Sequence, residues 1–242
     1  MVKLTPELIN SCMQFINPCR DRELDLRGYK IPEIQNTGAT LDQFDTIDFS
    51  DNDLRKLGGF AYLPRLKQLL LNNNRITRIA DDLHETIPNL ESIILTGNNL
   101  QELGDIDPLS KLQKLTVLSL LTNPIASKKF YREYVIYKLP HLRLLDFKKI
   151  KDKERQESVT FFKSKKGKEV QREIQKKARL SLANDNTNAS KPKIQASSAE
   201  IQKIRDMITN ATSLHEVERL TKMLQSGNIS EVLIQDEDEP MN

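Results

Sequence analysis

Apolar residues recur at fixed intervals through the first half of the chain. Residues 63–76 read LPRLKQLLLNNNRI, and the segments 41–54, 87–100 and 112–125 place apolar side chains at the same positions. Within each unit, two of these positions are separated by a single residue, as in a strand with one buried face. Each unit therefore predicts one short strand followed by a return segment, and successive units predict strands that stack in parallel.

An asparagine occupies one fixed position in all four units. Asn52, Asn74, Asn98 and Asn123 follow one another at steps of 22, 24 and 25 residues. The complete pattern, L-x-x-L-x-x-L-x-L-x-x-N-x-L, is typical of leucine-rich repeats, whose periods are roughly 20 to 29 residues. An amide at a buried bend can bond backbone groups that the bend leaves unpaired. We therefore predict an α/β fold, a leucine-rich repeat solenoid with a curved parallel sheet, in which the asparagine ladder is structural.

Less regular segments flank the four units and predict caps. Residues 22–31 read as a degenerate first repeat with Tyr29 in the asparagine position, and residues 139–147 read as a last repeat. Near the N-terminus, Thr5 and Pro6 predict a helix start, because threonine is a good N-cap and proline suits the first helical position. Residues 130–137 hold four aromatic side chains and predict a helix that closes the other end.

Composition changes past residue 150. Residues 148–179 hold thirteen Lys or Arg and five Asp or Glu, although the whole chain carries a net charge of only +3. Residues 181–199 are rich in Ser, Asn, Ala and Lys, whereas apolar residues return at helical spacing after residue 200. We predict an N-terminal cap at 1–20, repeats at 21–150 with the C-terminal cap at about 130–150, a basic helical extension at 151–180, a linker at 181–199, a helical tail at 200–226 and a disordered acidic tail at 227–242.

The sequence contains no recognisable catalytic or cofactor-binding pattern. The three histidines lie in unrelated contexts, and Cys12 and Cys19 stand near no other metal ligand. The N-terminal residues lack the apolar stretch of a signal peptide, and no run of about 18 apolar residues predicts a membrane span. We therefore predict a non-catalytic binding module of the cytosol or nucleus, without metal, cofactor, membrane or small-molecule substrate.

Strand geometry identifies the side chains that line the concave face. Side chains alternate along a strand, so the residues on either side of each buried leucine point to the concave surface. In strand order the central row is Asp25, Asp48, Leu70, Ile94, Ser119 and Asp146. The preceding row is Glu23, Thr46, Gln68, Ser92, Val117 and Leu144, and the following row is Arg27, Ser50, Asn72, Thr96, Leu121 and Lys148.

The middle of this face is apolar and its N-terminal part is acidic. An apolar patch rimmed by charge is typical of a protein contact, and a trough suits an amphipathic helix with basic residues at one end. The alternative is that these are scattered surface residues, which are common on folded proteins. We predict a partner-binding site formed by Glu23, Asp25, Asp48, Gln68, Leu70, Asn72, Ser92, Ile94, Thr96, Val117, Ser119 and Leu121.

Basic side chains cluster after the last strand rather than in the trough. Contacts to nucleic-acid phosphates need exposed Lys or Arg and no particular fold. Lys149, Lys151 and Lys153, next to the predicted cap, suit either RNA contact or simple solvation. For the basic run at 163–179, a nuclear import signal or solvation is the favoured interpretation.

Over about residues 1–170 the chain resembles a known family. The opening MVKLTPELI, the phrase RELDLRGYKIPEIQNTGATLDQFDTIDFSDNDLRKLGGF and the cap FYREYVIYKLPHLRLLDFKKIKDKER are similar to the A-prime proteins of the U2 small nuclear ribonucleoprotein, a leucine-rich repeat family. The resemblance implies a nuclear, non-catalytic spliceosomal adaptor in pre-mRNA splicing. It also implies an RNA-recognition-motif partner, the B-double-prime protein, with a helix in the concave trough, and a stem-loop of U2 snRNA bound by the pair.

The same resemblance implies a few direct contacts to the RNA stem backbone from basic residues near the ends of the array. The positions that suit these contacts are Arg27, Lys149, Lys151 and Lys153. Two other function classes remain open: a regulatory subunit that docks on a phosphatase or another enzyme, and a histone-binding repeat protein. The lack of aromatic residues in the concave rows disfavours the first, and the basic block with its short acidic tail disfavours the second.

Overall fold

The computed structural model describes residues 2–188. Residues 1 and 189–242 lie outside the described residues, and with them the predicted helical tail, the predicted acidic tail and the greater part of the predicted linker. Within the described part of the chain, no helix is long and apolar enough to cross a membrane.

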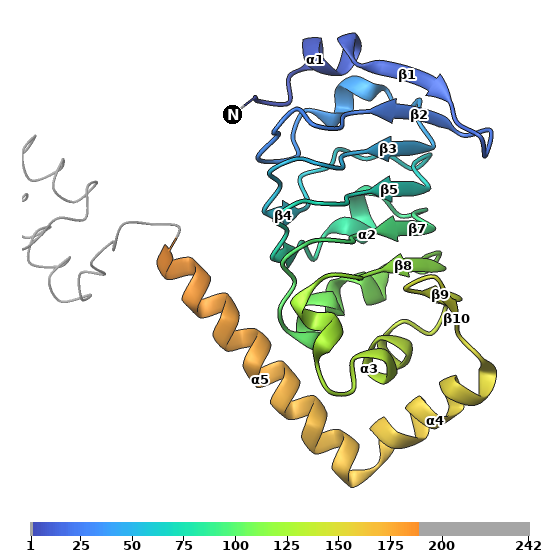
Figure 1. Cartoon of the computed structure of the whole chain (residues 1–242), viewed down its shortest axis with the longest axis vertical. Helices are drawn as coiled ribbons and strands as arrows, with labels where there is room; N and C mark the ends of the chain where they lie inside the picture. The colour runs from blue at the N-terminus through green and yellow to red at the C-terminus, as the bar shows by residue number, and fades with distance from the viewer. Residues whose placement is uncertain (1, 189–242) are drawn as a thin grey trace, which may run out of the picture. The chain divides into compact units, whose positions relative to one another are not determined.

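The repeats form one eight-stranded sheet (Figure 1). In spatial order its strands are β1 (Met13–Ile16), β2 (Arg22–Asp25), β3 (Thr46–Asp48), β5 (Gln68–Leu70), β7 (Ser92–Ile94), β8 (Val117–Ser119), β9 (Leu144–Leu145) and β10 (Lys148–Lys149). Neighbouring strands from β2 to β9 are parallel, whereas β1 and β10 pair antiparallel at the two ends. The predicted fold class, a leucine-rich repeat solenoid with a parallel sheet, is confirmed.

The return segments hold short helices and a second, two-stranded sheet. In that sheet β4 (Lys56–Leu57) pairs in parallel with β6 (Arg78–Ile79). The α-helices are α1 (Pro6–Ser11), α2 (Leu83–Thr86), α3 (Tyr131–Lys138), α4 (Asp152–Lys163) and α5 (Lys165–Asn188). The 3-10 helices, which suit short connections, are η1 (Thr37–Thr40), η2 (Leu103–Lys111) and η3 (Pro124–Ser127).

One continuous apolar core fills the space between the main sheet and the return segments. It runs from Leu4 in the N-terminal cap to Ile174 in α5. Leu69 and Leu118, in the middle of their strands, are fully buried. Burying a leucine side chain contributes about 1.5–3 kcal/mol. Because each strand contacts only the strands before and after it, each repeat is held mainly by its two neighbours.

The four asparagines connect adjacent repeats. The Oδ1 atom of Asn98 accepts the backbone N–H of Ile76 at 3.0 Å, and its Nδ2 donates to the carbonyls of Leu71 at 2.8 Å and Leu95 at 3.0 Å. All four amides are buried and bonded to backbone groups of two repeats. Equivalent bonds are made by Asn52, Asn74 and Asn123.

The N-terminal cap contains a helix and an edge strand. Helix α1 begins at Pro6, and the hydroxyl of Thr5 accepts the N–H of Leu8 at 3.3 Å, as the sequence predicts. Strand β1 then pairs antiparallel with β2. The sequence pattern does not predict β1, because Met13 and Ile16 are both exposed and the strand has no alternation of buried and exposed residues.

The last repeat turns back on itself. Asp146 and Phe147 have positive φ angles of 53° and 59°, and β10 folds back antiparallel on β9. The carboxylate of Asp146 accepts the N–H of Leu120 at 2.8 Å and the hydroxyl of Tyr131 at 2.8 Å. The prediction that Asp146 and Lys148 continue the concave rows is therefore wrong. Periodicity predicts the strand register but not the hairpin that ends it.

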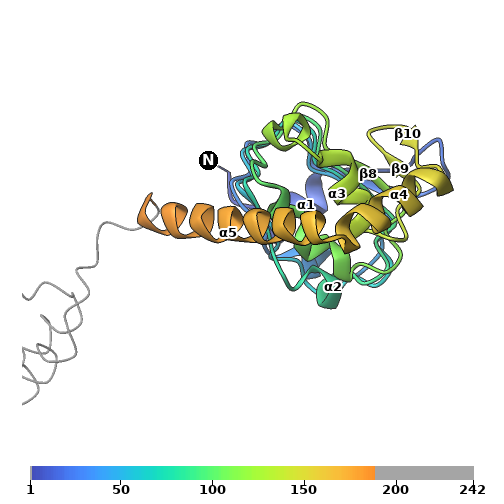
Figure 2. The ribbon, with the colours of Figure 1, turned by 90° about the horizontal axis from the view of Figure 1, so that it is seen from below.

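Helices α3, α4 and α5 close the C-terminal end. The ring of Phe162 in α4 lies 5.7 Å from that of Tyr134 and 4.9 Å from that of Tyr137, both in α3. Helix α5 then runs back beside the return segments (Figures 1 and 2), where Ile174 is buried. Helix α5 continues to Asn188, past residue 180, where the predicted basic extension ends.

Candidate functional site

The strand register brings the predicted concave residues together in rows. Neighbouring strands lie roughly 4.8 Å apart, so residues in one register form a continuous line of side chains. One row consists of Glu23, Thr46, Gln68, Ser92, Val117 and Leu144. A second row consists of Asp25, Asp48, Leu70, Ile94 and Ser119. Just beyond the strand ends lie Ser50, Asn72, Thr96 and Leu121.

The centre of this surface is apolar and accessible. Leu70 and Ile94 pair directly across β5 and β7, and both are half-buried. Val117, on the next strand, is also half-buried, and Leu121 is 39% exposed. The four side chains thus form an apolar patch, and patches of this kind mark protein contacts.

Polar side chains beside this patch are bonded to one another. The Nδ2 atom of Asn72 donates to the hydroxyl of Ser50 at 3.1 Å, and the hydroxyls of Thr96 and Ser119 lie 3.0 Å apart. Ser119 is only 1% exposed, so it contributes to the shape of the surface more than to direct contacts with a partner. These bonds hold the side chains in place before any partner binds, which lowers the entropy cost of association.

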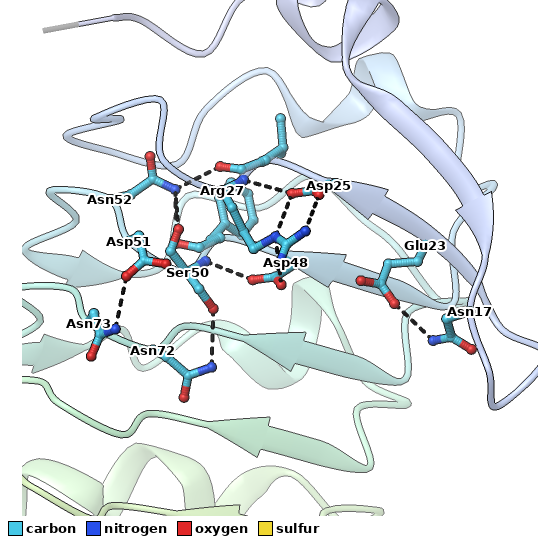
Figure 3. Close-up of polar contacts among 12 residues, drawn as sticks. Asn17, Glu23, Asp25, Arg27, Asp48, Ser50, Asp51, Asn52, Asn72 and Asn73 are labelled. Atoms are coloured by element: carbon cyan, nitrogen blue, oxygen red, sulfur yellow. Dashed lines mark hydrogen bonds and ion pairs between the residues drawn. The ribbon is translucent and has the colours of Figure 1, made fainter.

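The acidic end of the concave face is paired within the chain (Figure 3). The Nε of Arg27 donates to Oδ1 of Asp25 at 3.0 Å, its Nη2 donates to Oδ2 at 2.6 Å, and Nε lies 3.5 Å from a carboxylate oxygen of Asp48. The carboxylate of Glu23 accepts the side-chain amide of Asn17 at 2.9 Å. Hydrogen bonding from Arg27 lowers the pKa of Asp25, which keeps that carboxylate ionised.

This pairing changes the interpretation of the acidic residues. From the sequence, Asp25 and Asp48 are expected to be free to pair with basic residues of a partner. In the structure Arg27 neutralises part of their charge, although the two carboxylates together with Glu23 still outnumber the single guanidinium. Asn17 has no place in the repeat pattern, because it lies in the turn between β1 and β2, so no periodic signal identifies it.

The basic residues expected to contact RNA lie at opposite ends of the sheet. Lys149 is in β10, Lys151 precedes α4 and Lys153 lies in the first turn of α4, and all three are exposed. Lys153 lies 4.0 Å from Glu157, and such exposed pairs are weak. Arg27 follows β2, six strand steps from β10, which is roughly 29 Å at standard strand spacing. The structure therefore groups the three lysines and separates Arg27 from them.

The described residues offer little for catalysis or metal binding. Residues 2–188 contain no cluster of three or more His, Cys, Asp or Glu side chains that could hold a metal ion. Cys12 is buried and Cys19 is exposed. The Nδ1 of His84 lies 3.0 Å from the carbonyl oxygen of Asp81. The accessible apolar patch makes the concave surface the candidate functional site.

Comparison with known proteins agrees with this architecture. The leucine-rich repeat family model matches residues 1–175, so the chain is a leucine-rich repeat protein. A probable U2 small nuclear ribonucleoprotein A' of Drosophila melanogaster is 59% identical over 237 residues, which cover 95% of this chain and 89% of that relative. The U2 small nuclear ribonucleoprotein A' of Homo sapiens is 54% identical over 229 residues, which cover 95% and 90%. The chain belongs to the family of U2 small nuclear ribonucleoprotein A' proteins.

A solved structure extends this comparison to three dimensions. The crystal structure of the Drosophila melanogaster SNF/U2A' complex contains a chain that is 68% identical to this one and superposes with a TM-score of 0.70. The match covers 72% of this chain and 100% of that chain. That relative therefore shares the repeat fold and was crystallised together with SNF.

Proposed function

We propose that this chain is a non-catalytic subunit of the U2 small nuclear ribonucleoprotein and acts in pre-mRNA splicing in the nucleus. Its concave face binds an RNA-recognition-motif protein, the counterpart of B-double-prime, and the pair binds a stem-loop of U2 snRNA. Family membership supports the assignment to this particle. The observation that carries the adaptor role is the accessible apolar patch on a continuous sheet, in which Leu70 and Ile94 lie in one row and Val117 lies in the adjacent row.

The proposed partner segment is an amphipathic helix that lies in the trough. Burial of apolar area contributes about 25 cal/mol per Å² before the costs of association are subtracted. The rows are held by strand pairing and by the bonds of Asn72 and Thr96. The trough therefore needs little reorganisation on binding, and most of the ordering cost falls on the partner.

The acidic end sets the direction of the partner helix in this proposal. Glu23, Asp25 and Asp48 keep a net negative charge after pairing with Arg27, so this end favours a basic residue of the partner. Charge complementarity of this kind contributes more to orientation and association rate than to affinity. In this proposal the apolar patch therefore supplies most of the free energy of binding.

Lys149, Lys151 and Lys153 are the proposed contacts to the RNA backbone. They are exposed and grouped at the C-terminal end of the sheet. Each phosphate contact releases counterions, so its contribution falls as salt rises. Arg27 is a weaker candidate, because an RNA phosphate must compete with Asp25 for its guanidinium.

Recovery of RNA with the full-length chain from nuclear extract tests this function. We expect enrichment of U2 snRNA over the other spliceosomal RNAs, together with an RNA-recognition-motif protein. Prior depletion of that partner protein should remove most of the U2 snRNA. Recovery of an enzyme such as a phosphatase, without U2 snRNA, would contradict the proposed function.

A further inference from the structure

Helix α5 is fixed to the repeat array along one face. At about 100° per residue, Val170 and Ile174 lie on the same side of the helix. Ile174 is buried, and Val170 packs against the core. A Cβ atom added to Gly104, at the start of η2, would lie only 2.5 Å from the Cβ of Ala178. The helix and the repeats therefore approach too closely in this region for a larger residue at position 104.

The opposite face of α5 carries a line of basic side chains, the basic stripe. It consists of Lys165, Lys168, Arg172 and Lys176. Their spacing of three, four and four residues confines them to an arc of roughly 80° over a length of about 16 Å. All four are exposed, and among the described residues none of them forms a side-chain ion pair.

We propose that the basic stripe binds the phosphate backbone of a double-stranded RNA segment. Residues 165–177 contain six basic and two acidic residues, and charge on this scale attracts a polyanion. From 165 to 178 the apolar residues Val170, Ile174 and Ala178 lie on the packed side of the helix. The exposed side therefore offers charge without an apolar surface.

This composition favours an RNA duplex over other polyanions. Binding sites for single strands use aromatic side chains on which bases stack, and the sequence from 165 to 178 contains none. The centre of a protein interface is enriched in aromatic residues and depleted of Lys. A duplex presents phosphates without requiring stacking, and contacts to them are largely independent of sequence.

Docking of α5 onto the repeats holds its basic side chains on a preformed surface. A solvated peptide with the same composition would have to order its backbone on binding, whereas α5 is held by Ile174 and by its close approach to Gly104. The stripe is separate in the chain from Lys149, Lys151 and Lys153, because all of α4 after its first turn lies between Lys153 and Lys165. The inference rests on the proposed function only for the identity of the RNA, which would be a helical part of U2 snRNA.

Binding of the full chain to a mixed-sequence RNA duplex of about 20 base pairs, followed by fluorescence anisotropy from about 50 to 250 mM salt, tests the stripe. The variant combines Lys165→Gln, Lys168→Gln, Arg172→Gln and Lys176→Gln. The matched control removes four exposed basic residues elsewhere, through Lys3→Gln, Arg55→Gln, Lys56→Gln and Lys114→Gln. Glutamine keeps helix propensity, and circular dichroism checks that both variants are folded.

We expect the stripe variant to bind the duplex at least tenfold more weakly at low salt and to lower the slope of log K against log salt by about three. The control should keep most of the slope. Glu169→Gln, which removes a carboxylate beside the stripe, should tighten binding about twofold to threefold. Equal slopes for the stripe and control variants would overturn the proposal, as would binding of an acidic polyglutamate peptide as tight as that of the duplex.

The same variants separate this inference from the proposed function. The stripe variant should bind the RNA-recognition-motif partner like the wild type, because no stripe residue lies in the concave rows. Failure of the wild-type chain to bind that partner would contradict the proposed function. It would not affect the measurement of duplex binding, which does not involve the partner.

Discussion

Arg27 and Asp25 form a two-point ion pair on the rim of the concave face, with Nε to Oδ1 at 3.0 Å and Nη2 to Oδ2 at 2.6 Å. The pair joins a residue expected to contact RNA to a residue expected to contact protein. The side chain of Arg27 remains 54% exposed, so it is accessible beside the concave face. The two roles can be separated by substitution.

Removing the charge of Arg27 should affect RNA and partner binding differently from removing the charges of the three C-terminal lysines. Combined Lys149→Gln, Lys151→Gln and Lys153→Gln should lower the salt slope of RNA binding by the assembled pair by about two to three, because each lost phosphate contact removes roughly one. Arg27→Gln should change the slope by less than about one. It should instead make the association rate with the partner more salt-dependent, because Asp25 and Asp48 become unpaired. Stopped-flow and anisotropy titrations measure both quantities, and a larger RNA effect from Arg27 would contradict this view.

A charge in the apolar patch should weaken partner binding without unfolding the array. Leu70→Glu and Ile94→Glu each place a carboxylate in the centre of the trough, where the partner would have to desolvate it. Each should weaken binding by at least about tenfold, or 1.4 kcal/mol. Both residues are half-buried, so the melting temperature should fall only modestly. Tyr62→Glu, at a site 67% exposed outside the concave rows, is the control and should bind normally in calorimetry.

The asparagine ladder should affect stability rather than recognition. Asn98→Ala removes the acceptor for Ile76 N–H and leaves that buried group unsatisfied. It also removes one of two donors to the Leu71 carbonyl, which keeps the bond from Asn74 at 3.2 Å. We expect a loss of about 2–3 kcal/mol in the free energy of unfolding, measured by urea denaturation. The adjacent and exposed Asn99→Ala is the matched control, with an expected change within about 0.5 kcal/mol. A folded Asn98→Ala protein with normal stability and lost partner binding would show a ligand role instead.

Asp45 should make the array sensitive to acid. Its carboxylate accepts a hydrogen bond from Arg65 at 3.0 Å and the N–H of Arg22 at 3.1 Å, and lies 3.2 Å from the Nζ of Lys67. The Arg65 hydrogen bond is the main reason that the pKa of Asp45 falls from 3.8 to about 2. A carboxyl group whose pKa is lower in the folded state than in the unfolded state stabilises the fold when the pH is above its unfolded-state pKa. This contribution is lost as the pH falls through its folded-state pKa.

The expected size is modest, because Arg65 and Lys67 are 49% and 48% exposed and solvent screens their charges. We expect about 1 kcal/mol of unfolding free energy to disappear between about pH 4 and pH 2 in the wild type. Asp45→Asn should lose this part of the pH dependence and be less stable at neutral pH. Urea denaturation of both proteins across this range measures the difference, and parallel curves would contradict the assignment.

Gly104 should control the docking of α5. Gly104→Ala places a Cβ 2.5 Å from that of Ala178, so the helix must shift away from η2. Overpacking of this kind costs about 1–3 kcal/mol. Hydrogen exchange should become faster in residues 165–178 while the sheet strands keep their protection. Gly38→Ala is the control, because its Cβ would meet Ala61 at an ordinary 3.6 Å. Unchanged exchange in α5 of the Gly104 variant would show that the helix is not held there.

The repeat pattern by itself determined the architecture and the register. Inward leucines such as Leu69 and Leu118 alternate with outward residues. Each repeat is a short, local segment of sequence that packs on a neighbouring repeat of the same kind. The concave positions of Leu70 and Ile94 follow from the same spacing. Periodicity is sufficient here because strand alternation and one-dimensional stacking leave a single arrangement that buries the inward-facing leucines of the strands.

Only the tertiary structure decided how the ends and the charged groups are used. The pairing of Arg27 with Asp25, the return hairpin at Asp146 and the close approach of α5 to Gly104 depend on side-chain direction and on contacts outside the repeat. A sequence period specifies which face a residue lies on. It does not specify which neighbour its polar atoms reach, because that choice depends on hydrogen-bond geometry in the folded chain.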